Sequence, residues 1–251
     1  VISRLFSNIM PVAPLIIDKV KLPANSFKTI VEDNVVNVCF IIDQSGSMYG
    51  SEADVIGGFQ KVIDEQRAVK EGKCTVSMFK FEDRVEECFV GKDVNEVGEL
   101  VYTPGGCTAL NDAVCIAVDR IGEWLAAMPE SERPAKNMVV VITDGQENAS
   151  RRYTHKDARE RIQHQTDKYG WTFVYLGANI TDATEAREMG FENTGYMDKK
   201  DLNRAFGAIH SVAYCFRARK NDEDANLFLD KELADMTAEF EQKSGVEIKG
   251  K

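Results

Sequence analysis

The sequence predicts an α/β fold built on a mostly parallel sheet, and three observations lead to this prediction. First, two apolar runs, residues 38–42 and 138–142, continue without a break and end at a turn that contains an aspartate. Runs of this length that are rich in valine and isoleucine are typical of strands buried on both faces. Second, segments with helical spacing alternate with the predicted strands, which indicates parallel strands joined by helices. Third, residues 74–81 and 85–90 are separated by three polar residues and predict a hairpin, so one edge strand is antiparallel.

The spacing of apolar residues also places the remaining elements. Inside the helix predicted over residues 53–69, the pair Gly57–Gly58 costs about 1 kcal/mol per glycine relative to alanine. We therefore expect a close approach at these glycines, with the sheet as the neighbour. Thr154 and Asp157 match a capping box and mark the start of a later helix. The full prediction is strands over 38–42, 74–81, 85–90, 138–143, 171–176 and 191–197, and helices over 53–69, 109–128, 154–168, 180–189 and 201–217.

The chain is expected to have three parts. Residues 1–34 contain Pro11, Pro14 and Pro23 with few periodic signals, and we interpret them as an extended N-terminal arm. Residues 35–217 form the α/β domain. Residues 218–251 form a helical tail with a charged surface and a narrow apolar stripe, which packs on its own domain or, alternatively, docks on a partner or a second copy. The stripe consists of Leu229, Leu233, Met236 and Phe240.

Charge and composition argue against several classes of function. The chain has 251 residues, of which 31 are basic and 41 acidic, so its formal net charge is −10. This balance argues against binding to nucleic acid or anionic membranes, because both favour basic patches. The apolar runs are far shorter than the roughly 20 residues that span a bilayer, and Val1–Ile17 lacks the pattern of a signal peptide. We expect a cytoplasmic protein whose six cysteines are reduced and show no zinc-site spacing. The three histidines are expected to face solvent or to be satisfied in the core.

Oxygen-bearing side chains follow the two buried runs. Asp43, Ser45 and Ser47 occupy alternate positions directly after the first run, and Asp144 follows the second. Thr108 stands where a Pro-Gly-Gly loop enters the next helix. Ligands bind at the carboxyl ends of the strands in an open α/β sheet, so these oxygens converge if the strands of the two runs are neighbours. Carboxylate and hydroxyl oxygens around a tight turn suit a hard divalent cation such as Mg²⁺.

Three stretches of the sequence together resemble the metal-ion-dependent adhesion site (MIDAS) of von Willebrand factor A (vWA) domains. They read IIDQSGSM from residue 41, TPGGCTALNDAV from residue 103 and VVVITDGQEN from residue 139. The resemblance covers about residues 35–217, and all five ligand positions of the family motif are present. It implies a Rossmann-like, doubly wound sheet that is mostly parallel, with one antiparallel edge strand and helices on both faces.

The resemblance implies a metal-dependent protein–protein interaction module and not an enzyme. By position, Ser45 and Ser47 would bind the metal directly, whereas Asp43, Thr108 and Asp144 would bind directly or through water. The expected cofactor is a divalent cation, Mg²⁺ first, with Mn²⁺ and Ca²⁺ as alternatives. The expected partner is a protein that offers a Glu or Asp carboxylate to the metal. The stretch YGWTFVYLGANI and the intracellular type of composition resemble stand-alone bacterial or phage members of the family.

Three alternatives compete with this interpretation. A Mg²⁺-dependent hydrolase of phosphatase type would need a second acid two residues after Asp43 or a lysine in the site, and the site loops carry neither. A nucleotide-binding domain would need a glycine-rich phosphate loop, and neither G-x-G-x-x-G after the first strand nor G-x-x-x-x-G-K-[ST] occurs. A structural domain with a vestigial site would have no need to keep all five ligand positions.

Overall fold

The computed structural model describes residues 34–218 and 222–250 of the chain. The predicted N-terminal arm therefore lies outside the described residues, apart from Asn34. The strands are β1 (Val35–Asp43), β2 (Lys73–Phe81), β3 (Val85–Asp93), β4 (Lys136–Thr143), β5 (Thr172–Ala178) and β6 (Asn193–Met197). The helices are α1 (Glu52–Ala68), α2 (Leu110–Ala126), α3 (His155–Tyr169), α4 (Thr184–Glu188), α5 (Leu202–Arg217) and α6 (Asp222–Ser244).

The six strands form one sheet in the order β3-β2-β1-β4-β5-β6. β1 pairs in parallel with β2 and β4, and Phe40 lies opposite Met78 on one side and Val140 on the other. β3 runs antiparallel to β2 at the edge of the sheet. The predicted α/β fold with a mostly parallel sheet and one antiparallel edge strand is confirmed. The strands that carry the two apolar runs are direct neighbours, which is the condition for their loops to converge.

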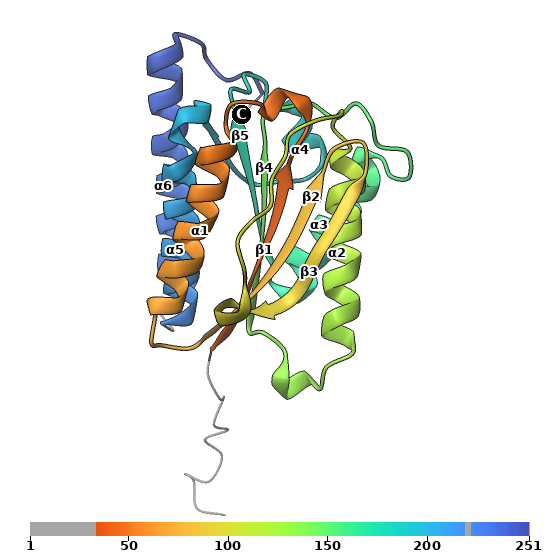
Figure 1. The fold of residues 1–251 in the computed structure, drawn as a ribbon, viewed down its shortest axis with the longest axis vertical. Coiled ribbons are helices and arrows are strands. Elements are labelled where there is room, and N and C mark those ends of the chain that lie inside the picture. Colours follow the sequence, from red (N-terminus) through yellow and green to blue (C-terminus); the bar gives the residue numbers. More distant parts are fainter. Residues whose placement is uncertain (1–33, 219–221, 251) are drawn as a thin grey trace, which may run out of the picture. The chain divides into compact units, whose positions relative to one another are not determined.

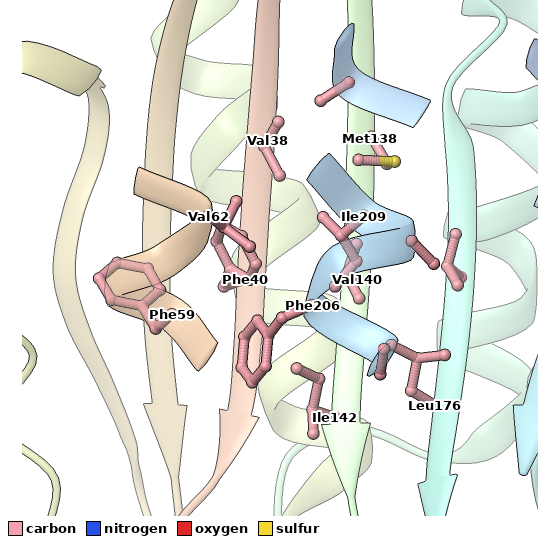
Figure 2. Close-up of a cluster of buried hydrophobic side chains, with 14 of the residues drawn as sticks. Val38, Phe40, Phe59, Val62, Met138, Val140, Ile142, Leu176, Phe206 and Ile209 are labelled. Atoms are coloured by element: carbon pink, nitrogen blue, oxygen red, sulfur yellow. The ribbon is translucent and has the colours of Figure 1, made fainter. Parts of the chain in front are cut away.

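Helices cover both faces of the sheet. Figure 1 shows α1, α5 and α6 on one face, and α2 and α3 on the other. Along β1, Phe40 belongs to the core under α1 and α5, whereas Ile41 belongs to the core under α2. The ring centroid of Phe40 lies 5.3 Å from that of Phe59 in α1 and 6.2 Å from that of Phe206 in α5, in the cluster of Figure 2. Each large apolar side chain removed from water contributes about 1.5–3 kcal/mol, so both faces hold the strands in place.

The glycine pair in α1 approaches a helix and not the sheet. A Cβ atom on Gly58 would lie 2.1 Å from Cδ2 of Phe206 in α5, whereas one on Gly57 would meet nothing within 4 Å. The predicted close approach is therefore confirmed for Gly58, but the predicted neighbour is wrong. Residue 58 must be small because α1 and α5 pack side by side at this point.

α4 is shorter than the helix predicted over residues 180–189, since it spans only Thr184–Glu188. Asp182 forms a parallel β-bridge with Lys249 from the end of the chain. The carboxylate of Asp182 also accepts a hydrogen bond from the N–H of Thr184 at 2.9 Å. Both interactions hold the chain in a non-helical conformation up to the start of α4.

The C-terminal helix α6 packs on its own domain, against β6 and α5. The four apolar residues of its predicted stripe are buried. A Cβ atom on Gly195 of β6 would lie 2.7 Å from Cδ2 of Leu233, so the glycine leaves room for the helix. The N–H of Tyr196 donates to the hydroxyl of Thr237 at 3.1 Å. Of the two interpretations of the tail, packing on its own domain is the one that the structure contains.

A buried arginine closes the amino end of the sheet. Arg217, at the end of α5, is 4% exposed and donates five hydrogen bonds to the end of α1 and the loop before β2. Its Nε donates to the carbonyl of Glu71 at 3.1 Å. One terminal nitrogen donates to the carbonyl and the side-chain oxygen of Gln66, and the other donates to the carbonyls of Val69 and Gly72. Since a guanidinium has five N–H groups, every donor of this side chain has a partner.

All six cysteines are free thiols in the structure. Burial raises the pKa of Cys74 and of Cys115 to about 12, so these two are unreactive core residues. Within the described part of the chain, no helix is long and apolar enough to cross a bilayer.

Candidate metal centre

The structure brings all five predicted site residues to the carboxyl end of the sheet. Asp43 is the last residue of β1, and Ser45 and Ser47 lie in the turn that leads to α1. Asp144 directly follows β4, and Thr108 lies just before α2. Three loops that are distant in the sequence therefore contribute to one place in the fold.

Asp43 is completely buried and held in one orientation. The N–H of Ser45 donates to its Oδ1 at 2.7 Å, and the hydroxyl of Thr143 donates to its Oδ2 at 2.6 Å. Burial raises the pKa of Asp43, the hydrogen bonds from Thr143 and Ser45 lower it, and the charge of Asp144 raises it. The hydroxyl of Tyr102 donates to the Asp43 carbonyl, which fixes the backbone as well. The carboxylate is thus preorganised before any ligand arrives.

Ser45, Ser47 and Asp144 form a chain of oxygens across two loops. The Oγ atoms of Ser45 and Ser47 lie 3.0 Å apart, and the Ser47 hydroxyl donates to Oδ1 of Asp144 at 2.6 Å. Ser47 is exposed to solvent, whereas the side chain of Asp144 is only 2% exposed. The site is therefore accessible to solvent at Ser47, whereas Asp144 is shielded from solvent.

Backbone hydrogen bonds hold Thr108 against the other two loops. Its N–H donates to Oδ1 of Asn148 at 2.9 Å, and its carbonyl accepts from the N–H of Asn148 at 3.0 Å. The N–H of Gly46 donates to the carbonyl of Gly106 at 3.0 Å, which joins the turn after β1 to the loop that carries Thr108. These bonds fix the three loops relative to one another without using the predicted ligand atoms.

Gly145, in the loop after β4, leaves a space that is lined by oxygens from the other two loops. A Cβ atom on Gly145 would lie 2.8 Å from Oγ1 of Thr108, and 3.5 Å from both Oδ2 of Asp43 and Oγ of Ser47. Glycine keeps this space open, and any larger residue would fill it. Carboxylate and hydroxyl oxygens are the ligands that hard divalent cations prefer. The donor set and the space between the loops therefore fit a divalent cation.

Two acidic residues that support the site were missed by the sequence prediction. Glu147 accepts from the N–H groups of residues 149–150 at 2.9 and 2.7 Å, and from the N–H of Asn111 in α2 at 2.8 Å. Asp112 accepts hydrogen bonds from the backbone N–H groups of residues 151–153. Together these carboxylates fasten the loop after β4 to the start of α2. Both lie inside the motif stretches, and this position is the signal that could have identified them.

A lysine from a distant part of the chain also reaches the site. Lys199, in the turn after β6, forms an ion pair with Oδ2 of Asp144 and donates to the carbonyl of Ser47. The three site loops themselves carry no lysine, as the sequence indicated, and Lys199 reaches the site from outside them. No local pattern marks Lys199, because it reaches the site only through the arrangement of β6 in the sheet.

Histidines take no part in this centre. Nδ1 of His155 lies 2.7 Å from Oδ1 of Asn111, and Nδ1 of His210 lies 3.1 Å from Nε2 of Gln66, so both rings have polar partners. Among the residues that the structure describes, no group of three or more His, Cys, Asp or Glu side chains is arranged to hold a metal ion. The candidate centre differs from such groups because three of its five side chains are hydroxyls.

Three solved structures with a similar fold are two bacterial proteins and one animal protein. The von Willebrand factor domain of the type V pili tip protein Mfa5 from Porphyromonas gingivalis has a TM-score of 0.55 at 12% identity, covering 76% of this chain and 98% of that one. The von Willebrand factor type A protein from Catenulispora acidiphila has a TM-score of 0.51 at 17% identity, covering 72% and 43%. Proximal thread matrix protein 1 from the mussel byssus, with a zinc-occupied MIDAS motif, has a TM-score of 0.50 at 16% identity, covering 72% and 46%. The chain spans less than half the length of the last two proteins.

No curated protein matches the chain significantly. Over residues 37–211, however, the chain matches the family model described as von Willebrand factor type A domain. The matched residues run from β1 into α5 and include all five predicted site residues. The chain therefore belongs to the von Willebrand factor type A domain family.

Proposed function

We propose that this vWA domain binds Mg²⁺ or a similar divalent cation and, through the cation, recognises a Glu or Asp side chain of a partner protein. Domains of this family are modules for metal-dependent protein interaction. The observation that carries the proposal is the convergence of oxygens of Asp43, Ser47 and Thr108 on the space beside Gly145, with Asp144 joined to Ser47 by a hydrogen bond. The mussel byssus protein with zinc in its MIDAS motif supports a cation at this position of the fold.

The charges of the site favour an acidic ligand. Asp43 and Asp144 supply one negative charge each, and the hydroxyls of Ser45, Ser47 and Thr108 are neutral. Ser45 and Ser47 would hold the cation directly, and the other three residues directly or through water. A doubly charged cation that keeps exchangeable water positions can accept one more carboxylate from outside. The exposed Ser47 puts this free position on the solvent side.

The hydrolase alternative gains Lys199 but lacks an accessible nucleophile. Asp43 is 0% exposed, and both of its carboxylate oxygens accept hydrogen bonds within the protein. A nucleophile has to reach the reacting atom, and a buried carboxylate cannot meet a phosphoester. We therefore favour binding over hydrolysis. Turnover of a generic phosphoester that disappears in Asp43→Ala would reverse this preference. We also propose that the chain is a stand-alone bacterial or phage protein of the cytoplasm, which rests on the stretch YGWTFVYLGANI and on the composition.

Thermal unfolding with Mg²⁺, Mn²⁺, Ca²⁺ or excess chelator tests the metal site. A cation at one hundred times its dissociation constant adds about 2.7 kcal/mol of stability, which corresponds to a rise in melting temperature of roughly 5–10 °C for a domain of this size. Asp43→Ala and Ser47→Ala should lose this rise, and the second variant removes only an exposed hydroxyl. Asp167→Ala, an exposed aspartate of α3, is the matched control and should keep the rise. A wild type that melts at the same temperature in every cation and in chelator would contradict the proposal.

The free position on the cation can be tested without knowing the partner. Mn²⁺ bound to the domain should enhance the relaxation of water protons, because water exchanges at the open position. Millimolar acetate, a minimal Glu or Asp side chain, should reduce this enhancement, whereas chloride at the same ionic strength should not. Binding of Mn²⁺ with no effect of acetate would leave a metal site but contradict recognition of an acidic side chain.

A further inference from the structure

Lys199 holds one oxygen of a carboxylate in the candidate metal centre. Oδ1 of Asp144 accepts from the hydroxyl of Ser47 at 2.6 Å, whereas Oδ2 pairs with Nζ of Lys199. Nζ of Lys199 also donates to the backbone carbonyl of Ser47. The ammonium therefore joins the loops after β1 and β4. The side chain of Lys199 is 23% exposed, so a path to solvent exists.

The backbone of Lys199 is fixed by the turns around it. Its N–H donates to Oδ1 of Asn179 at 3.2 Å, and the N–H of Asn179 donates to the carbonyl of Met197 at 2.7 Å. Asn179 has a φ of 57° and is the non-glycine residue of the described chain with positive φ. Asp198 accepts from the N–H of Lys200 at 2.9 Å and caps the turn. The fold therefore directs this lysine at the site.

Lys199 supplies the positive charge that lies beside the site carboxylates in the structure. Among the described residues, it is the one cation within 4.0 Å of a carboxylate oxygen of Asp43 or Asp144. A carboxylate as buried as that of Asp144 is costly to leave without a partner. A divalent cation among the hydroxyls would place two further positive charges beside the same carboxylate. The ammonium and the cation would then both lie beside Asp144, and their like charges repel. They therefore compete for this carboxylate.

We propose that Lys199 is a built-in counter-ion, which stabilises the metal-free site and weakens its affinity for divalent cations. Lys199 leaves Asp144 for solvent when a cation binds. The inference rests on the proposed function, because it requires that the five oxygens hold a cation. Its consequence is a threshold: the site fills only at cation concentrations higher than the same oxygens would need without the lysine.

Lys199→Met tests the inference, since methionine keeps most of the side-chain length and removes the charge. Lys200→Met is the matched control, because Lys200 is an exposed neighbour in the same turn and the change in net charge is identical. By calorimetric titration with Mn²⁺, Lys199→Met should bind at least tenfold more tightly than wild type, and Lys200→Met within twofold. In chelator, Lys199→Met should melt several degrees below Lys200→Met, and saturating Mn²⁺ should remove this difference.

The outcomes separate the inference from the proposed function. If wild type binds Mn²⁺ and Lys199→Met binds it no more tightly, the counter-ion role of Lys199 is overturned and the metal site stands. Binding in Lys199→Met alone supports the counter-ion, because removal of the ammonium then opens the site. Absence of binding in both proteins overturns the inference together with the proposed function.

The wild-type chain provides a second measurement that does not depend on the folding of a variant. Acetic anhydride modifies free amines, and mass spectrometry reads the extent of acetylation at each lysine. With saturating Mn²⁺, Lys199 should be acetylated several-fold faster than in chelator, whereas the rate at Lys200 should not change. An equal or slower rate at Lys199 would show that the ammonium is not released and would overturn the inference.

Discussion

Two polar clusters lie at opposite ends of the same sheet, one around Arg217 at the amino end and one around Asp43 at the carboxyl end. At the amino end, five N–H groups of one guanidinium meet five oxygens, so donors and acceptors balance. At the carboxyl end, two carboxylates and three hydroxyls supply seven oxygens, and five donor groups of the described residues reach them, the ammonium of Lys199 among them. The comparison teaches that a balanced cluster serves the fold, whereas a surplus of oxygens around an open space serves a cation.

Disrupting the balanced cluster should have the largest effect. Arg217→Met would leave the carbonyl groups at the end of α1 buried without a donor, at about 1–3 kcal/mol for each group. We expect a loss of at least about 3 kcal/mol, which lowers the melting temperature by roughly 6–12 °C for a domain of this size. Thermal unfolding in chelator measures this loss without a contribution from metal.

Arg204→Met on the same helix is the control for Arg217→Met. Arg204 pairs with Glu239 at 2.7 Å and is 32% exposed, so its ion pair contributes less than about 1 kcal/mol. Arg217→Met should also keep the rise in melting temperature with Mg²⁺ or Mn²⁺, because the two clusters lie at opposite ends of the sheet. A variant that melts within 2 °C of wild type would show that the arginine is not structural.

Filling the open space should have an intermediate effect. In Gly145→Ala, a methyl group enters the space between Thr108, Asp43 and Ser47, and we expect the affinity for Mn²⁺ to fall at least tenfold, or about 1.4 kcal/mol. The backbone tolerates alanine, because Gly145 does not have positive φ. Gly105→Ala is the control, since a Cβ atom there meets nothing within 4 Å. Equal affinities in both variants would contradict the assignment of this space to the cation.

Protonation of His210, near the amino end of the sheet, should have the smallest effect on stability. Burial lowers the pKa of His210, Glu65 raises it, and Arg217 and Lys61 lower it. A histidine with a lowered pKa binds fewer protons in the native state than in the unfolded state. Stability is therefore complete above the unfolded pKa of about 6.5 and is lost as the pH falls towards the folded value. Because the ring is partly exposed, the loss should stay below about 1 kcal/mol.

His210→Gln is the variant that isolates this pH dependence. Melting temperatures between pH 7.5 and 5 should fall less steeply in His210→Gln than in wild type, because glutamine does not titrate. The hydrogen bond between Gln66 and Nδ1 of His210, at 3.1 Å, also requires a neutral ring. Identical slopes in the two proteins would assign the pH dependence to other groups.

Sequence patterns were sufficient to predict the strands and the place where the loops after β1 and β4 meet, for a physical reason. Unbroken apolar runs mark the buried strands, and ligand loops follow the carboxyl ends of such strands, so Asp43 and Asp144 could be placed together. Thr108 follows no such run, and the family resemblance was needed to add it. Thr143 lies inside the same motif, and its hydroxyl could have been expected to face the neighbouring loop. These features depend on short stretches of sequence and on the order of strands.

The residues that were missed depend on packing between distant segments. Lys199 reaches Asp144 because the turn after β6 lies beside the loop after β4, and no spacing in the sequence records that proximity. The neighbour of Gly58 was wrongly predicted for the same reason, since the contact with α5 joins residues far apart in the chain. α4 was predicted too long because the bridge between Asp182 and Lys249 involves the end of the chain.

The order of strands has a consequence for the kinetics of folding. β2 and β3 form a local hairpin, but β1 pairs with β2 and β4 across long stretches of chain, and such non-local pairing forms slowly. Asp43 and Asp144 meet only after this pairing is complete, so we expect the site to be absent in the transition state for folding. A cation bound there would slow unfolding and leave the folding rate unchanged. Metal supply would then set the lifetime of the folded domain and not the speed at which it forms.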